Sequence, residues 1–85
     1  MQVILKKQPQ KYLASVDVPT REKLMRALEG LKRLEGDIVR LIGTDNLYRL
    51  KIAHYRIIFS YSDGKIIVVE TINTRTNTKY RRLGK

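Results

Sequence analysis

The sequence contains no cysteine, so it can form neither a disulfide nor a metal site with thiolate ligands. It has no apolar run that approaches the length of a membrane span, and its first residues lack the apolar segment of a secretory signal. Histidine occurs once, as His54, in a predicted turn where a surface role is commoner than a catalytic one. We therefore expect a cytoplasmic protein with no membrane association.

Acidic residues are also scarce. The chain has 8 of them against 18 lysines and arginines, which gives a net charge of +10 and a pI of about 10.2. Such a field attracts anions, so nucleic acid, an acidic protein and a membrane surface are the candidate partners. The few carboxylates form no cluster with metal-ligand spacing, and the GxSxG, P-loop and HExxH motifs are missing. We expect no metal and no other cofactor.

The 85 residues are predicted to form one domain, with a basic C-terminal tail from about residue 74. β-branched residues, alternation of apolar and polar side chains, and turn signals between them indicate short strands. The stretch 37–46 is predicted to be a connection, although its apolar residues need some cover. The segments expected to form strands are residues 2–6, 47–52, 55–61 and 65–73.

Two helices are expected between the first and second strands. The first begins near Pro9, whose missing N–H is no loss in a first turn, and ends near Ser15. The second is capped by Asp17 or Thr20 and stopped by Gly36, and its apolar residues recur with the 3.6-residue period of one buried face. The fold class is therefore α+β: a mostly antiparallel four-stranded sheet with both N-terminal helices packed on one face.

Two hairpins decide which side chains share a face of the sheet. The dipeptide Asp63-Gly64 is a strong signal for a two-residue loop, whereas Ala53-His54 is a weaker one. With such loops at both places, the expected opposite pairs are Lys51 with Arg56, Arg56 with Thr71, Ile58 with Val69, and Ser60 with Ile67.

Alternation then gives the sheet one apolar face for the helices and one face that carries charge. The apolar face comprises Tyr48, Leu50, Ile52, Tyr55, Ile57, Phe59, Ile66, Val68 and Ile72, with Glu70 pointing the same way. The charged face holds Arg49, Lys51 and Arg56 at one end, together with Thr71, Asn73 and, in an extended chain, Arg75. Its other end holds Ile58, Ile67 and Val69.

Three cations at one end of a sheet face are unfavourable, because like charges on facing strands repel at a cost on the order of tenths of a kcal/mol. Such a cost is typical of a binding site, and a concave group of arginine and lysine suits a phosphate. Two alternatives stay open. Arg49 and Lys51 could be solvated residues whose stems cover apolar neighbours, and a one-residue slip of register would scatter the group.

RNA cleavage is a reaction that such a surface can support without histidine or metal. The substrate supplies its own nucleophile, the 2′-hydroxyl, and the protein aligns it and stabilises the charge at phosphorus. Neighbouring cations favour the uncharged form of a lysine, which makes Lys51 a conceivable base. For Tyr80, stacking on a base and packing on the domain edge are equal alternatives. The tail contributes further basic candidates for RNA contact: Arg75, Lys79, Arg81 and Arg82.

The order of elements and the stretch LYRLKIAHYRIIFSYSDGKIIVVETI together resemble the RelE/ParE superfamily of bacterial toxins. Members commonly show a YR-(L/I)-(K/R) strand, a turn, a YR-(I/V)-(I/V)-(F/Y) strand and an apolar last strand. The likeness covers nearly the whole chain and is sharpest over residues 47–72. The RelE branch cleaves messenger RNA on the ribosome and is neutralised by a cognate antitoxin, so the resemblance implies an endoribonuclease with those partners.

The resemblance also implies roles for individual strand residues. Lys51 falls at the position of the candidate base, and Arg56 at that of the arginine that binds the scissile phosphate. Arg49 corresponds to a basic residue that binds substrate. His54 departs from the pattern, since its turn position is commonly held by Gly, Asp or Asn.

In the tail, the resemblance places Arg75 where the family has an arginine that serves as acid or phosphate ligand. Tyr80 falls near a tyrosine that stacks on a base, and Lys79 and Arg81 flank it as further substrate-binding candidates. The segment NTRTNT departs from the family because it lacks the glycine that often precedes the last arginines.

We therefore expect a toxin of a type II toxin–antitoxin pair that cuts messenger RNA on the ribosome without a metal. A ParE-like inhibitor of DNA gyrase is the alternative, and a nucleic-acid-binding module without activity is a third reading. The facing Lys51 and Arg56 favour the first, since a protein–protein inhibitor has less need of a phosphate site. The antitoxin is expected to cover the helix surface or the apolar group Ile58, Ile67 and Val69.

Overall fold

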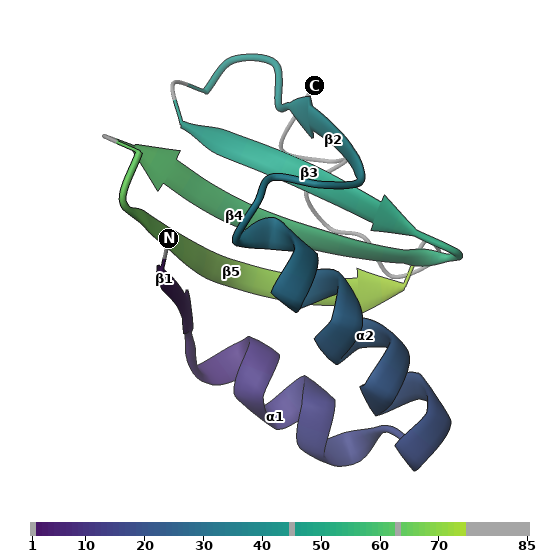
Figure 1. The fold of residues 1–85 in the computed structure, drawn as a ribbon. Coiled ribbons are helices and arrows are strands. Elements are labelled where there is room, and N and C mark those ends of the chain that lie inside the picture. The colour runs from purple at the N-terminus through teal and green to yellow at the C-terminus, as the bar shows by residue number, and fades with distance from the viewer. Residues whose placement is uncertain (1, 45, 63, 75–85) are drawn as a thin grey trace.

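The computed structural model describes residues 2–44, 46–62 and 64–74 (Figure 1). Its sheet has five strands in the order β1-β5-β4-β3-β2, with β1 parallel to β5 and the other neighbours antiparallel. The α+β class with two N-terminal helices is confirmed, but the expected count of four strands is one too few. The elements are β1 (Gln2–Leu5), α1 (Lys7–Ser15), α2 (Val18–Leu31), β2 (Asp37–Arg40), β3 (Leu47–Ile52), β4 (Tyr55–Ser62) and β5 (Ile66–Thr74).

Both helices cover the same face of the sheet, and their leucines meet the apolar side of the central strands (Figure 1). The helices supply periodic apolar residues, and the strands supply β-branched and aromatic ones that are removed from water, which is the main stabilising term of the fold. The buried core consists of Leu13, Leu24, Leu28, Leu31, Leu50, Ile57, Phe59, Ile67, Val69 and Ile72.

The start of α2 is fixed by polar contacts. The Asp17 carboxylate accepts a hydrogen bond from Thr20 N at 3.0 Å, which is the expected N-cap. One turn further on, Arg21 reaches back to the end of α1, where its Nε donates to Leu13 O at 2.8 Å and its Nη2 to Val16 O at 3.1 Å. The guanidinium thereby satisfies carbonyls that α1 leaves without partners and holds the two helices together.

The end of α2 differs from the expectation that the helix continues to Gly36. The helix ends at Leu31, and Leu34 adopts a left-handed conformation with φ of 53°. Gly36 has φ of 118°, and a Cβ there would lie 2.7 Å from Leu50 Cδ1. Gly36 therefore permits both the sharp turn and the close approach of the chain to β3, rather than ending a helix.

The stretch predicted to be a connection contains a strand. Residues Asp37–Arg40 form β2, which pairs with β3 and places Ile38 opposite Leu50. Ile38 packs against the core, whereas Val39 is 43% exposed and Ile42 is 95% exposed. A four-residue strand with charged ends shows almost no alternation in sequence, and its pairing with β3 is what makes it a strand.

The first hairpin has the expected register. Ile52 pairs with Tyr55 and Lys51 with Arg56, so residues 53 and 54 form a two-residue loop. Ala53 takes the left-handed conformation there, with φ of 52°. The turn therefore forms although its sequence lacks the glycine or asparagine that favours it.

The second hairpin does not have the expected register. Ser62 pairs with Ile66, so the connection comprises positions 63, 64 and 65 rather than two residues. Phe59 consequently faces Val69, and Ser60 faces Val68 instead of Ile67. A β-bulge between Ile58 and Phe59 then shifts the ladder again, and the remaining pairs are Ile58 with Thr71, Ile57 with Ile72, and Arg56 with Asn73 instead of Thr71.

This shift changes which apolar residues of β5 face the helices. Ile67 and Val69 are fully buried in the core. The prediction that they lie on the charged face of the sheet, where an antitoxin could cover them, is therefore wrong. Ile66 and Val68 alternate with them, and Ile66 is 41% exposed. The prediction that Ile66 and Val68 face the helices is therefore also wrong.

Candidate functional site

The face of the sheet away from the helices gathers the predicted cations into two neighbouring rows across the strands. The alternation of buried Leu50 and Ile57 with their neighbours places Arg49, Lys51 and Arg56 on this second face. From β2 to β5, one row contains Asp37, Lys51, Arg56 and Asn73, and the next contains Val39, Arg49, Ile58 and Thr71. We call Arg49, Lys51 and Arg56 the cation cluster.

Two members of the cation cluster hold buried nitrogens that find no hydrogen-bond partner among the described residues. These atoms are Arg49 Nε and both Nε and Nη1 of Arg56. Leaving a buried donor unsatisfied costs about 1–3 kcal/mol, and more for a charged group, so such atoms are rare unless a ligand completes them. A phosphate offers several oxygens at the spacing of a guanidinium fork and is the chemical group that fits.

Carboxylates do little to neutralise the cation cluster. Arg49 Nη2 lies 3.8 Å from Asp37 Oδ1, which is a long ion pair to a largely exposed partner. Glu70 is held by Lys6, whose Nζ lies 2.8 Å from its Oε1. Within residues 2–44, 46–62 and 64–74, Arg56 has no ion pair.

Ile58 gives the cation cluster an apolar neighbour. It pairs with Arg49 on one side and with Thr71 on the other, and it is 6% exposed. Apolar surroundings strengthen the attraction between a cation and a bound anion, because less water screens the charges. Lys51 differs from the two arginines in that it is exposed to solvent.

Several predicted site residues lie outside the described residues. These are the tail candidates Arg75, Lys79, Tyr80, Arg81 and Arg82. Tyr48, for which core packing was expected, stacks on Phe59 with ring centroids 5.6 Å apart. His54 is exposed in the turn between β3 and β4, with its ring 4.2 Å from that of Tyr55.

Sequence reasoning missed Asp37 as a neighbour of the cation cluster. It pairs across β2 and β3 with Lys51, but its position becomes visible only once residues 37–40 are known to form a strand. Among the described residues, no group of three or more His, Asp or Glu side chains could hold a metal ion. In the same part of the chain, no helix has the length and apolarity needed to cross a membrane.

Comparison with known proteins adds a structural likeness. No protein-family model matches the sequence, and no curated protein matches it. Archaeal RelE in its complex with RelB from Pyrococcus horikoshii OT3 matches with a TM-score of 0.70 and 25% identity, over 91% of this chain and 97% of that one. RelE in the RelB–RelE antitoxin–toxin complex of Methanococcus jannaschii matches with a TM-score of 0.70 and 22% identity, over 86% of this chain and 91% of that one. The isolated E. coli RelE toxin matches with a TM-score of 0.72 and 16% identity, over 96% of this chain and 92% of that one.

Proposed function

Because this chain has the fold of the RelE-like toxin superfamily, we propose that it is the toxin of a type II toxin–antitoxin pair. In this proposal it is an endoribonuclease that cleaves messenger RNA on the ribosome. The observation that carries the proposal is the cation cluster with its buried, unpartnered guanidinium nitrogens. A fold alone supports many functions, so the chemistry of this cluster, rather than the likeness, supports the activity.

The proposed reaction uses the ribose 2′-hydroxyl as nucleophile. Its oxygen forms a bond to phosphorus as the bond from phosphorus to the 5′-oxygen breaks, which leaves a 2′,3′-cyclic phosphate and a 5′-hydroxyl. Arg56 and Arg49 bind the phosphate oxygens and stabilise the charge that grows on them. Lys51 faces Arg56 and acts as the base that accepts the 2′-hydroxyl proton.

A proton must also reach the departing 5′-oxygen. The family resemblance implies Arg75 for this step, and it remains a proposal because Arg75 lies outside the described residues. The reaction needs no metal, because the nucleophile belongs to the substrate and the cations stabilise the phosphate. The substrate-binding residues Lys79, Tyr80 and Arg81 complete the proposed site.

The proposed partners follow from the charge and from the structural relatives. A net charge of +10 suits docking on ribosomal RNA, with an affinity that falls steeply as salt rises. Two of the matching structures are toxin–antitoxin complexes, which supports a cognate antitoxin for this chain. The ParE-like alternative has no support from these structures, all of which are RelE proteins.

The test is inducible expression of the chain in bacteria, with messenger-RNA ends mapped during translation. We expect cuts at defined positions within codons, and a loss of at least about 100-fold in cleavage for Arg56→Ala, as for other groups that stabilise transition-state charge. Arg26→Ala is the matched control, because Arg26 is an exposed arginine of α2 and belongs to no ion pair in the described part of the chain. Growth arrest with intact messages and trapped gyrase–DNA complexes would instead establish the ParE-like function.

A further inference from the structure

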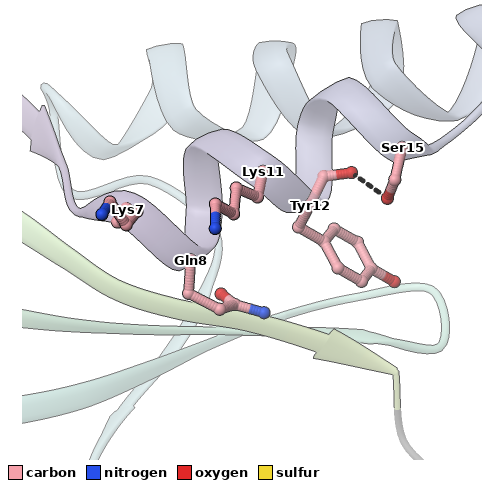
Figure 2. A pocket seen from close by; sticks show the side chains of 5 residues that line it. All are labelled: Lys7, Gln8, Lys11, Tyr12 and Ser15. Carbon is pink, nitrogen blue, oxygen red and sulfur yellow. Dashed lines mark hydrogen bonds between the residues drawn. The ribbon is translucent and has the colours of Figure 1, made fainter.

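A second basic surface lies on α1, away from the cation cluster. Lys7, Gln8, Lys11, Tyr12 and Ser15 line an open hollow of about 600 Å³ (Figure 2). The residues belong to one face of the helix, and the Tyr12 ring forms part of the wall beside the end of β5 (Figure 2). We call this feature the α1 hollow.

The charges of the α1 hollow are uncompensated. Lys7 and Lys11 are one helical turn apart, and α1 contains no acidic residue. Within the described residues neither lysine has an ion pair, so the two ammonium groups repel each other along α1. Two free ammonium groups beside an aromatic wall suit an anion that carries an aromatic group.

Tyr12 contributes an uncharged wall. Burial raises the pKa of Tyr12 above its ordinary value of 10.0, and the neighbouring Tyr55 adds to the effect. The phenol therefore stays protonated at neutral pH and does not repel an anion. Ser15 Oγ donates to Tyr12 O at 2.8 Å and so is engaged with the helix itself (Figure 2).

The α1 hollow is connected to the cation cluster around one edge of the sheet. Gln8, in the hollow, binds the backbone of Ile72 through Nε2 to Ile72 O at 2.9 Å and Ile72 N to Oε1 at 2.8 Å. The next residue, Asn73, pairs with Arg56 of the cluster. Strand β5 therefore lies between Gln8 and Arg56 at this edge of the sheet. An RNA chain of a few nucleotides can pass around this edge from the hollow to the cluster.

We propose that the α1 hollow binds the RNA chain next to the phosphate held by the cation cluster. In this arrangement Lys7 and Lys11 contact backbone phosphates, and the exposed part of the Tyr12 ring contacts a base or ribose. Paired cations with an aromatic surface are the usual means of binding single-stranded RNA without reading its sequence. The inference rests on the proposed function and extends it by giving the enzyme a substrate subsite beyond the reacting phosphate.

The test measures binding without cleavage and without the ribosome. Fluorescence anisotropy is recorded for a trinucleotide and a nonanucleotide of 2′-O-methyl RNA, which lacks the nucleophile and stays intact. We expect wild type to bind the nonanucleotide about tenfold more tightly, and Lys7→Ala/Lys11→Ala to lose that advantage while binding the trinucleotide within about twofold of wild type. The slope of log affinity against log salt for the nonanucleotide should shrink by about 1.4, the value for two single-strand phosphate contacts.

Matched variants separate this effect from general charge and from misfolding. Lys23→Ala/Arg26→Ala removes two exposed cations from α2 and should still bind the nonanucleotide about tenfold more tightly than the trinucleotide. Lys7→Arg/Lys11→Arg should restore that difference, and thermal melts should show all variants folded. Arg56→Ala should weaken binding of both RNAs, which reports on the cation cluster separately.

The outcomes are distinct. A wild type that binds both RNAs equally, or an equal loss in the α2 control, overturns the α1 subsite and leaves the proposed nuclease standing. A wild type that binds neither RNA overturns the α1 subsite, whereas the proposed nuclease is overturned only by intact messages in the expression assay. Unchanged RNA binding in Lys7→Ala/Lys11→Ala, combined with weakened binding of the antitoxin, would assign the α1 hollow to a protein and overturn the inference.

Discussion

The side-chain amide of Gln8 forms a two-point hydrogen-bonded pair with the backbone of Ile72, with distances of 2.9 and 2.8 Å. It does for β5 what a neighbouring strand would do, at a place where β1 has already ended at Leu5. Gln8 thus closes part of an edge that would otherwise expose free backbone groups. The residue after Ile72 is Asn73, which lies opposite Arg56.

We predict that Gln8→Ala lowers the free energy of unfolding by about 1–3 kcal/mol, because Ile72 loses both partners in a partly buried place. Urea unfolding measures this directly. Gln10→Ala is the control: Gln10 donates a single exposed hydrogen bond to Leu5 O at 2.8 Å, and its loss should cost less than about 0.5 kcal/mol. Equal costs in the two variants would contradict the edge-closing role.

Arg56→Met should raise stability while abolishing cleavage. The methionine keeps an apolar stem and removes two buried nitrogens that have no partner in the described part of the chain, so we expect a gain of about 1 kcal/mol in the free energy of unfolding. Arg49→Met should gain less, because it deprives Asp37 of its ion pair. Thermal melts and the messenger-RNA assay, run on the same preparations, test the trade-off. A marked loss of stability in Arg56→Met would show that the guanidinium is satisfied within the protein.

Two glycines should respond to alanine in opposite directions. Gly30 lies inside α2, and a Cβ there would approach nothing nearer than Glu35 at 3.8 Å, so Gly30→Ala should stabilise by about 0.5–1 kcal/mol. Gly36→Ala should destabilise, because its φ of 118° and the approach of Leu50 exclude a side chain. Guanidinium unfolding curves of the two variants check the pair, and the same sign for both would refute the described backbone.

The Asp17 cap predicts a pH dependence. Hydrogen bonds from the side chain and the backbone N–H of Thr20 hold the pKa of Asp17 below its ordinary value of 3.8. A group with a depressed folded pKa stabilises the protein above its unfolded pKa, and this contribution is lost as pH falls through the folded value. Wild type should therefore lose stability relative to Asp17→Asn below pH 3.8, since asparagine also caps a helix but does not titrate.

The measurement for Asp17 is the urea midpoint of both proteins at pH values from ~6 down to ~2. The comparison of the two curves removes the contribution of the other acids, including Glu35, whose pKa is lowered by Arg33. Parallel curves throughout the acid range would contradict a titrating cap at this position.

Strands β1, β3, β4 and β5 and the first hairpin could be predicted from local pattern, whereas strand β2 and the second hairpin could not. The pairing of Lys51 with Arg56 follows from alternation and a two-residue loop. The position of Ile67 depends on one extra loop residue and on a bulge, and each reverses which side chains face the core. Nothing in the alternation of β5 marks the bulge, because Ile66 to Val69 are all apolar.

The cation cluster could be predicted because its three members lie next to the loop of the first hairpin, whose length was predicted correctly. Asp37 was not, because a four-residue edge strand is stabilised by its neighbour rather than by its own sequence. The pattern IVRLI in residues 38–42 indicates apolar burial but does not distinguish Ile38, which packs on the core, from Ile42, which is exposed.

The parallel pairing of β1 with β5 has a consequence for synthesis. Gln2 meets Ile66 and Leu5 meets Val69, so β1 leaves the ribosome about 60 residues before the strand with which it pairs. Contacts so distant along the chain form late, and a nascent chain that stops short of β5 leaves β1 without its neighbour and β4 with one unpaired edge. Growth of the polypeptide thus delays the finished fold, and a cell meets this domain in working form only after β5 has been synthesised.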